Sequence, residues 1–272
     1  MNWWPAPAKL NLFLHVLARR ADGYHELQTV FRLIDAADLV GVAVRSDGEL
    51  RFSGIFGNDN LCLRAARLLQ QETGCQLGAD LALDKRLPVG GGLGGGSSDA
   101  ATVLLVLNRL WELGLRRPRL HTIAGNLGAD VPFFIFGESA LGEGLGERLQ
   151  PLSLPPAWYF VIAPQVTVST KEIFALALTH PGKRLKIPPF FAGLGENDLE
   201  PIVTARHPEV AQALDWLRRR SPKARMTGSG ACVFAELATE QEARALHAEL
   251  PRSMDGFVAR GLDRHPLYDW VN

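Results

Sequence analysis

Alternating apolar and polar positions near the start of the chain predict a strand from Ala8 to Val16. Leu10, Leu12 and Leu14 would face the core, because successive side chains of a strand point to opposite faces. The other face of this strand would carry Lys9, Asn11, Phe13 and His15. The same kind of pattern indicates further short strands at 30–33, 39–44, 81–83 and 133–136.

Apolar residues at helical spacing predict the helices of the first half. One helix begins at Asn60, and another runs from Ser98 to Trp111. The second is apolar nearly all round, so we expect it to be largely buried. A third starts at about Arg119 and ends at Gly128, since glycine commonly follows the last turn of a helix.

A proline-rich segment, Pro151–Pro156, is the best candidate for a domain boundary, which predicts domains at 1–150 and 151–272. Beyond it the pattern predicts strands at 158–163, 232–235 and 257–259. Helices would open at a Ser-x-x-Glu box, at a His-Pro pair and at a Thr-x-x-Glu box, which begin at Ser169, His207 and Thr239. Strands interleaved with helices in both halves indicate an α+β (mixed α/β) fold.

Composition narrows the class of protein. The 272 residues contain 29 basic and 29 acidic side chains, which argues against a protein whose main partner is nucleic acid. The three cysteines, Cys62, Cys75 and Cys232, have no metal-ligand spacing and are expected to be reduced thiols in the cytoplasm. The longest uncharged stretch, 149–170, is interrupted by prolines, so no membrane partner is expected.

The most informative segment is a glycine run that leads into the buried helix. Six of the seven residues from Gly90 to Gly96 are glycine, and two serines follow them. Each glycine costs conformational entropy on folding, so packing alone does not explain the run. Close approach of the backbone to a ligand does, and the free N–H groups at the start of the helix favour an anion. The segment therefore predicts a phosphate site.

Three other interpretations of the glycine run account for it less well. The dinucleotide pattern Gly-x-Gly-x-x-Gly is met by Gly90, Gly92 and Gly95, but no strand ending in an acid follows at the expected distance. A Walker A loop needs a lysine after its last glycine, and here Ser97 follows Gly96. A flexible linker would not lead into an apolar helix. A phosphate-binding loop of another type remains.

The segment Pro88–Ala101 resembles the ATP loop of the superfamily named for galactokinase, homoserine kinase, mevalonate kinase and phosphomevalonate kinase (GHMP kinases). Pro7–Leu12 resembles the first motif of these enzymes, and Thr227–Cys232 resembles their third. The resemblance implies an N-terminal ATP domain like the second domain of ribosomal protein S5. It also implies a C-terminal ferredoxin-like domain that binds substrate.

Two more segments, Arg20–His25 and Leu127–Pro132, narrow the resemblance to one branch of this superfamily. That branch phosphorylates the 2-hydroxyl of a methylerythritol linked to cytidine diphosphate, on the non-mevalonate route to isoprenoid precursors. The similarity extends from Trp4 to about Leu262. It implies ATP as co-substrate, Mg²⁺, a substrate with a cytidine diphosphate group, and a monomer or weak homodimer.

The resemblance assigns Lys9 and Asp130 as the catalytic pair; without it, Lys9 reads as a surface lysine and Asp130 as a turn residue. A carboxylate is a weak base towards an alcohol, and phosphoryl transfer asks mainly for positioning and charge neutralisation. Our hypothesis is that Asp130 orients the acceptor hydroxyl and takes its proton late. Lys9 would stabilise the negative charge between nucleophile and phosphoryl group.

The remaining assignments also rest on the resemblance. The ATP-binding residues would be Pro88, Gly90, Gly91, Gly92, Leu93, Gly94, Gly95, Gly96, Ser97, Ser98, Asn60 and Asn108, with Ser98 also a candidate Mg²⁺ ligand. The substrate-binding residues would be Asn11, Tyr24, His25, Phe174, Gly228, Ser229 and Gly230, with Tyr24 and Phe174 stacking on the cytosine and His25 reading its edge. Taken alone, the two asparagines are equally a helix cap and a surface residue, and the aromatic side chains are packing residues.

Three other functions stay open at this point. Another kinase of the superfamily, of the homoserine or mevalonate type, would have no nucleobase to stack on Tyr24 and Phe174. A ligand-binding or RNA-binding module is also found on folds of this kind, but neutral charge weighs against it. A nicotinamide oxidoreductase would bind NADH rather than ATP.

Overall fold

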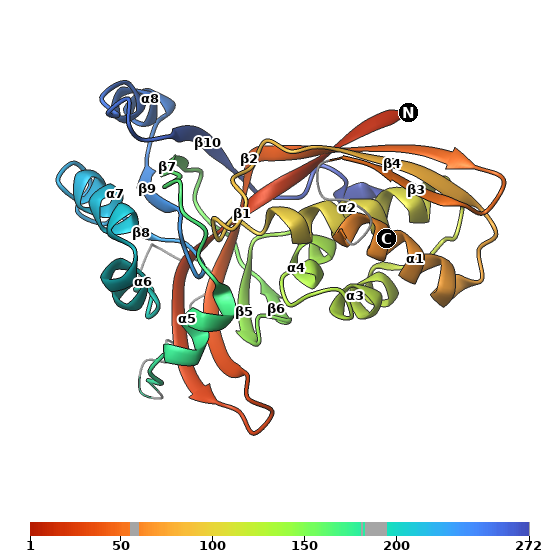
Figure 1. The fold of residues 1–272 in the computed structure, drawn as a ribbon, viewed down its shortest axis with the longest axis horizontal. Helices are drawn as coiled ribbons and strands as arrows, with labels where there is room; N and C mark the ends of the chain where they lie inside the picture. The colour runs from red at the N-terminus through yellow and green to blue at the C-terminus, as the bar shows by residue number, and fades with distance from the viewer. Residues whose placement is uncertain (55–59, 181, 183–194, 272) are drawn as a thin grey trace.

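The computed structural model describes residues 1–54, 60–180, 182 and 195–271, and it is mixed α and β throughout (Figure 1). The strands of the first half are β1 (Asn2–Arg19), β2 (His25–Arg45), β3 (Leu50–Ser53), β4 (Gly78–Asp84), β5 (Ala140–Gly144) and β6 (Arg148–Pro151). Its helices are α1 (Leu61–Thr73), α2 (Gly95–Leu110), α3 (Arg117–Gly125) and α4 (Val131–Phe136).

The second half contains strands β7 (Trp158–Ile162), β8 (Arg225–Met226), β9 (Val233–Leu237) and β10 (Gly256–Leu262). Its helices are α5 (Thr170–Leu176), α6 (Glu200–Arg206), α7 (Pro208–Arg218) and α8 (Glu240–Ala248), and the short 3₁₀ helix η3 (Tyr268–Trp270) follows β10.

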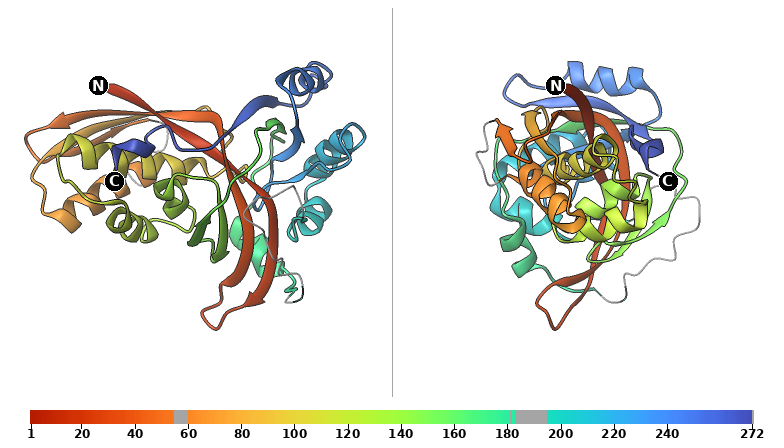
Figure 2. Two further views of the ribbon diagram at one scale, coloured as in Figure 1. Left: turned by 180° about the vertical axis from the view of Figure 1, so that it is seen from behind. Right: turned by 90° about the vertical axis from the view of Figure 1, so that its right-hand side faces the viewer.

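The N-terminal part is a long antiparallel hairpin with helices against one face. β1 pairs with β2 along almost its whole length, and β2 also pairs with β4, β5 and β10. Helices α1 to α4 gather beneath this sheet (Figures 1 and 2). Val40 and Val42 of β2 share a buried core with Val103 and Leu107 of α2. The nearly all-apolar composition of α2 is explained by this burial, as expected from the sequence.

The C-terminal part has the ferredoxin-like arrangement that the resemblance implies. Along the chain its elements run β7, α6 and α7, β8, β9, α8, β10, and the strands lie in the order β10-β7-β9-β8. Each neighbouring pair in that order is antiparallel. Phe160 of β7 and Leu214 of α7 lie in a core separate from that of the N-terminal part.

A third core joins the two parts. It contains Leu10 and Phe13 of β1, Leu93 of the glycine run, and Tyr159 and Phe234 of the C-terminal sheet. One sheet runs through both parts, because β10 pairs with both β7 and β2. The division of the chain at residue 150 therefore stays a prediction.

The end of the chain returns to the N-terminal helices. The Arg117 guanidinium of α3 donates to the carbonyl oxygens of Tyr268 and Val271 at 2.6 and 2.8 Å. Leu267 and Val271 join the core beneath the N-terminal sheet. The last described residues thus pack against the part of the protein that is farthest from them in sequence.

Three local predictions from the sequence are wrong. Residues 133–136 form helix α4 rather than a strand, because Pro132 lies in its first turn and Gly137 closes it with φ +77°. Helix α2 begins at Gly95, three residues before the expected Ser98. Helix α3 ends at Gly125, before the expected Gly128.

The polar face expected for β1 is buried as well. Lys9, Asn11 and His15 are each no more than 4% exposed. The register of β1 against β2 shifts between Asn11 and Phe13, which places Phe13 in the same core as Leu10. This strand therefore alternates in sequence although both of its faces are buried.

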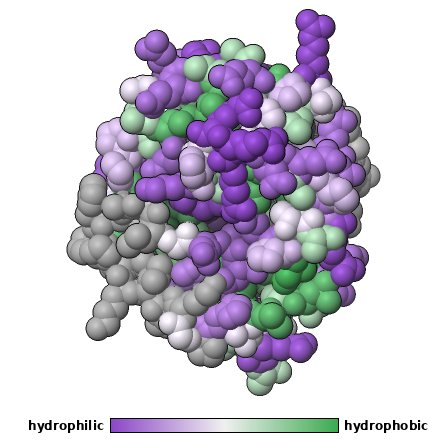
Figure 3. Space-filling model, turned by 90° about the vertical axis from the view of Figure 1, so that its left-hand side faces the viewer, coloured by the Kyte–Doolittle hydropathy of each residue, from purple (hydrophilic) through white to green (hydrophobic). Residues whose placement is uncertain are grey.

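The outer surface over the C-terminal helices is mostly hydrophilic (Figure 3). Among the described residues, no helix combines the length and apolar character that crossing a membrane requires.

Candidate active site

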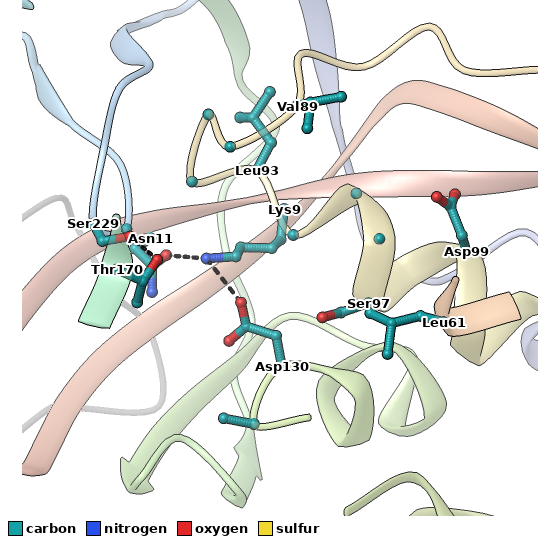
Figure 4. A pocket seen from close by; sticks show the side chains of 18 of the residues that line it. Lys9, Asn11, Leu61, Val89, Leu93, Ser97, Asp99, Asp130, Thr170 and Ser229 are labelled. Carbon is teal, nitrogen blue, oxygen red and sulfur yellow. Dashed lines mark hydrogen bonds and ion pairs between the residues drawn. The ribbon is translucent and has the colours of Figure 1, made fainter. Parts of the chain in front are cut away.

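A cavity of about 610 Å³ lies where the two parts meet (Figure 4). Its wall contains the whole glycine run from Gly90 to Gly96, the first residues of α1, the loop at Asp130, and Phe174 of α5. It also contains Gly228 and Ser229 from the turn before β9. Segments that lie far apart in sequence therefore line one cavity of a size that suits small-molecule ligands.

The glycine run needs its glycines for backbone conformation and for space. Gly90, Gly92 and Gly94 have φ values of +71°, +77° and +70°, which disfavour other residues. A Cβ atom on Gly92 would lie 2.4 Å from the carbonyl oxygen of Thr227. The loop is therefore held against the C-terminal turn by direct backbone contact.

The loop ends at the start of a long helix. Gly94 precedes the first residue of α2, which has 16 residues. The unpaired N–H groups and positive dipole end of such a helix attract phosphate oxygens. Ser97 in the first turn extends its side chain into the cavity beside Asp130 (Figure 4). The helix N-terminus therefore opens into the cavity at the place where the sequence predicts a phosphate site, and the site itself stays a prediction.

Lys9 and Asp130 are brought together on the floor of this cavity. Lys9 Nζ lies 3.5 Å from Asp130 Oδ2, and the two side chains are 4% and 36% exposed. The lysine reaches the cavity from the middle of β1, whereas Asp130 precedes the first residue of α4. Lys9 Nζ also donates to Asn11 Oδ1 at 2.5 Å and lies 5.6 Å from the centre of the Phe31 ring. This ammonium is thus held in place by three neighbours.

Two of the expected ATP-binding residues have other positions. The Ser98 hydroxyl is fully buried and donates to the Pro7 carbonyl oxygen at 2.7 Å, so it does not reach the cavity as a metal ligand. Asn108 lies near the far end of α2, where its amide bonds both backbone groups of Leu115 at 3.0 and 3.1 Å. It lines a different hollow, next to Arg116.

Asn60 combines its two expected roles. Its side chain accepts from the backbone N–H of Leu63 at 2.9 Å and caps the N-terminus of α1. It also lines the cavity, next to Leu61 and Cys62. The cap stabilises the first turn of α1, which forms part of the cavity wall.

The residues expected to hold the cytosine lie around the tip of the hairpin and on α5. The rings of His25 and Phe174 are 5.7 Å apart with an interplanar angle of 33°. Phe174 lines the cavity, whereas Tyr24 is 63% exposed at the hairpin turn. Burial, together with the charge of Arg19, lowers the pKa of His25, which favours the neutral ring.

Two of the three expected substrate-binding residues of the turn before β9 line the cavity. Gly228 and Ser229 line the cavity, and Gly230 lies behind them against Met226 and Val203. The Ser229 hydroxyl is 2.7 Å from the hydroxyl of Thr170, the first residue of α5. Thr170 also lines the cavity, and no sequence pattern pointed to it.

Sequence reasoning also missed an ion cluster in the cavity wall. Lys85 Nζ lies 2.5 Å from Asp38 Oδ2 and 3.0 Å from Asp99 Oδ2. Asp38 accepts in addition from the backbone N–H groups of Arg86 and Leu87 at 2.7 and 2.8 Å. Burial, reinforced by the negative charge of Asp38, raises the pKa of Asp99. The cluster joins β2, the residue that follows β4 and the second turn of α2.

No metal cage is found in the described part of the chain, where no three His, Cys, Asp or Glu side chains come together. The protein oxygens that line the cavity near Lys9 include the Asp130 carboxylate and the Ser97 hydroxyl (Figure 4). Mg²⁺ commonly binds with one or two carboxylates, substrate phosphates and water, and this set suits that mode.

The fold and the cavity together define a kinase of the GHMP type. The model of the GHMP kinase N-terminal domain matches residues 60–138, and that of the C-terminal domain matches residues 189–256. A crystal structure of a homoserine kinase from Cytophaga hutchinsonii aligns with a TM-score of 0.72 at 16% identity, covering 97% of this chain and 94% of that one. A likeness at this identity supports the fold alone.

The particular family follows from closer relatives. The chain is 59% identical to a 4-diphosphocytidyl-2-C-methyl-D-erythritol kinase of Thiobacillus denitrificans, over 98% of each chain. It is 57% identical to the enzyme of that name from Nitrosospira multiformis, over 98% of this chain and 93% of the relative. A crystal structure of a 4-(cytidine 5'-diphospho)-2C-methyl-D-erythritol kinase aligns with a TM-score of 0.80 at 36% identity, covering 96% of this chain and 99% of that one. The chain belongs to the 4-diphosphocytidyl-2-C-methyl-D-erythritol kinase family and is an ATP-dependent phosphotransferase.

Proposed function

We propose that this kinase transfers the γ-phosphoryl group of ATP to the 2-hydroxyl of 4-diphosphocytidyl-2-C-methyl-D-erythritol, in the non-mevalonate pathway to isoprenoid precursors. The observation that carries the proposal is the approach of Lys9 Nζ to within 3.5 Å of Asp130 Oδ2. The pair lies on the floor of the cavity, between the glycine run and the turn at Gly228. An acceptor hydroxyl and a γ-phosphate brought in from these two sides would meet at the pair.

The two charged side chains take different parts in the reaction. The more exposed Asp130 carboxylate accepts a hydrogen bond from the acceptor hydroxyl and takes its proton late. The buried Lys9 ammonium stabilises the negative charge that is shared between the hydroxyl oxygen and the phosphoryl group. Its electrostatic effect is strong, because little water competes with it at 4% exposure.

The nucleotide lies along the glycine run in this proposal. The backbone N–H groups of Gly94 to Ser97 and the start of α2 bind the phosphate oxygens. The base lies towards Asn60, Leu61 and Leu83, which give that end of the cavity an apolar lining with one amide.

Mg²⁺ belongs to the same proposal. The oxygens of ATP and water would hold most of its coordination sphere, with Asp130 and Ser97 as the protein groups. The bound ion would neutralise charge on the phosphate oxygens. The distinct task of the protein's own residues is to orient the hydroxyl and stabilise the charge at Lys9.

Substrate selection rests on the far side of the cavity. Phe174 offers a ring face for the cytosine, and the neutral His25 ring beside it offers a hydrogen bond to the base edge. Tyr24, exposed at the hairpin tip, would cover the other face of the base when the substrate enters. The hydroxyl pair of Thr170 and Ser229 faces the diphosphate.

The test is a phosphoryl-transfer assay with three acceptors, 4-diphosphocytidyl-2-C-methyl-D-erythritol, homoserine and mevalonate, each with Mg²⁺ and with a chelator. We expect turnover with the cytidine substrate alone, and only when Mg²⁺ is present. Turnover with homoserine or mevalonate at a comparable rate would contradict the proposed substrate. Undiminished turnover in the chelator would contradict the part assigned to Mg²⁺.

The cellular location and the oligomeric state are further proposals. The neutral balance of charges and the reduced cysteines support a cytoplasmic enzyme, and a monomer or weak homodimer is expected from the family. Analytical ultracentrifugation at several protein concentrations measures the oligomeric state directly.

A further inference from the structure

A chain of hydrogen bonds runs behind the catalytic lysine. Lys9 Nζ donates to Asn11 Oδ1 at 2.5 Å, and Asn11 Nδ2 donates to Thr29 Oγ1 at 2.8 Å. The Thr29 hydroxyl donates in turn to the backbone carbonyl oxygen of Phe13 at 2.5 Å. Lys9, Asn11 and Thr29 all line the active-site cavity, and all three are at least 96% buried.

The direction of each bond in this chain is fixed by chemistry. A carbonyl oxygen only accepts, so the Thr29 hydroxyl must give its proton to Phe13. The Thr29 hydroxyl oxygen then accepts a hydrogen bond from Asn11. The amide of Asn11 must therefore present its NH₂ group to Thr29. The carbonyl end of that amide is left facing the Lys9 ammonium.

The last acceptor of these hydrogen bonds, the Phe13 carbonyl oxygen, lies at an irregularity in the strand pairing. The register of β1 against β2 shifts between Asn11 and Phe13. Such a bulge leaves ladder positions unpaired and turns side chains, and bulges are common beside active sites. Here the Thr29 hydroxyl donates to the Phe13 carbonyl oxygen, next to the register shift.

We infer that Thr29 is a positioning residue of the kinase reaction, acting through Asn11 on the ammonium of Lys9. The inference rests on the proposed catalytic role of Lys9. Lysine has four rotatable bonds, and Asp130 is a partner at 3.5 Å, longer than a hydrogen bond. The short bond to Asn11 therefore sets where the ammonium lies, and Thr29 sets where Asn11 points.

The test compares Thr29→Val, which keeps the size and branching of the side chain but removes the hydroxyl, with Thr29→Ser, which keeps the hydroxyl. We expect Thr29→Val to lower kcat about 10-fold and to leave the KM for ATP unchanged, since the glycine run is not touched. Thr29→Ser should stay within about twofold of the wild-type kcat. Equal kcat values for Thr29→Val and the wild type would overturn the inference.

A double-mutant cycle separates positioning through Asn11 from direct substrate contact or general damage. In an Asn11→Ala background, Thr29→Val should change kcat by less than about twofold, because the group on which it acts is missing. Additive losses in the double variant would overturn the inference. If Thr29→Val does not fold, Thr29→Cys replaces it in the same cycle, since a thiol is a weak hydrogen-bond partner.

A readout that does not involve turnover completes the test. The side-chain NH₂ group of Asn11, observed by NMR, should exchange slowly with solvent in the wild type and in Thr29→Ser, and faster in Thr29→Val. Unchanged exchange in all three would overturn the inference. The variants are compared on whichever alcohol the wild-type enzyme phosphorylates. A wrong substrate assignment then shows in the wild type, and a wrong assignment of Thr29 shows only between variants.

Discussion

The backbone N–H of Lys9 donates to the carbonyl oxygen of Leu93 at 3.0 Å, in the middle of the glycine run. The side chain of the same lysine reaches Asp130. One residue of β1 thus connects the loop that is proposed to bind phosphate with the carboxylate that is proposed to face the acceptor. Leu93, the only residue of the run with a side chain, is buried in the core between the two parts of the protein. Movement of the loop relative to the catalytic pair is restricted by these contacts.

Replacing Asp130 with asparagine should lower kcat by about 10² to 10⁴-fold, because the amide cannot accept the hydroxyl proton. ATP binding measured without Mg²⁺ should persist, since the glycine run and α2 do not depend on this side chain. Steady-state kinetics and ATP titration measure the two effects. Asp215→Asn, on the exposed face of α7, is the matched control. Near-normal kcat in a folded Asp130→Asn enzyme would contradict the proposal that Asp130 accepts the proton of the acceptor hydroxyl.

Two glycines of the same loop should respond in opposite ways to alanine. Gly92→Ala should lower the free energy of unfolding by about 1–3 kcal/mol, because its φ is +77° and the new Cβ would lie 2.4 Å from the Thr227 carbonyl oxygen. Gly96→Ala should leave stability unchanged or raise it, since it lies inside α2 and its Cβ would meet only Leu61 at 3.6 Å. Denaturant titration without ATP gives both values. An equal fall in the free energy of unfolding in both variants would contradict the close approach of Gly92 to the Thr227 carbonyl oxygen.

Phe174→Ala should raise the KM for the cytidine substrate about 10-fold or more, because one aromatic stack on a base is removed. The KM for ATP should not change, because ATP is proposed to lie along the glycine run, on the other side of Lys9. Leu176→Ala, on the same helix but 45% exposed, serves as the control for damage to α5. A rise confined to the KM for ATP would place the cytosine elsewhere.

His265 should make stability depend on pH. Burial, helped by the nearby Arg117 charge, lowers the pKa of His265 to about 3 in the folded protein. In the unfolded chain the ring takes up a proton near pH 6.5. The free energy of unfolding should therefore fall as pH drops from about 6.5 towards 3, by up to about 1.4 kcal/mol per pH unit from this group.

The variant that tests this is His265→Asn, whose side-chain oxygen can accept from the Leu267 N–H as Nδ1 does at 3.0 Å. Denaturant titrations at pH 8, 6 and 4.5 compare it with the wild type. The variant should lose less stability than the wild type between pH 6 and 4.5. Parallel curves over that range would show that His265 does not contribute.

Much of the active site could be predicted from the sequence, because it is encoded in short segments. The glycine run requires its glycines locally, and α2 follows it directly, so the two segments predicted a phosphate site without any long-range information. The order of the motifs that contain Lys9 and Asp130 indicated the family, which the relatives confirm. The Thr239 capping box was also a local pattern, and both of its hydrogen bonds are present.

Only the tertiary structure decided which of these residues meet and in what environment. Asp38 and Lys85 lie 47 positions apart, and no periodicity pairs them. Asn108 lies in α2, the helix that follows the glycine run. Because α2 has 16 residues, Asn108 lies near the end of the helix opposite the glycine run and bonds Leu115 there. The alternation in β1 predicted a polar face, and the second half of the chain covered it. The sequence determined local conformation and the type of chemistry; distance, burial and hydrogen-bond direction arose from long-range packing that a local pattern does not contain.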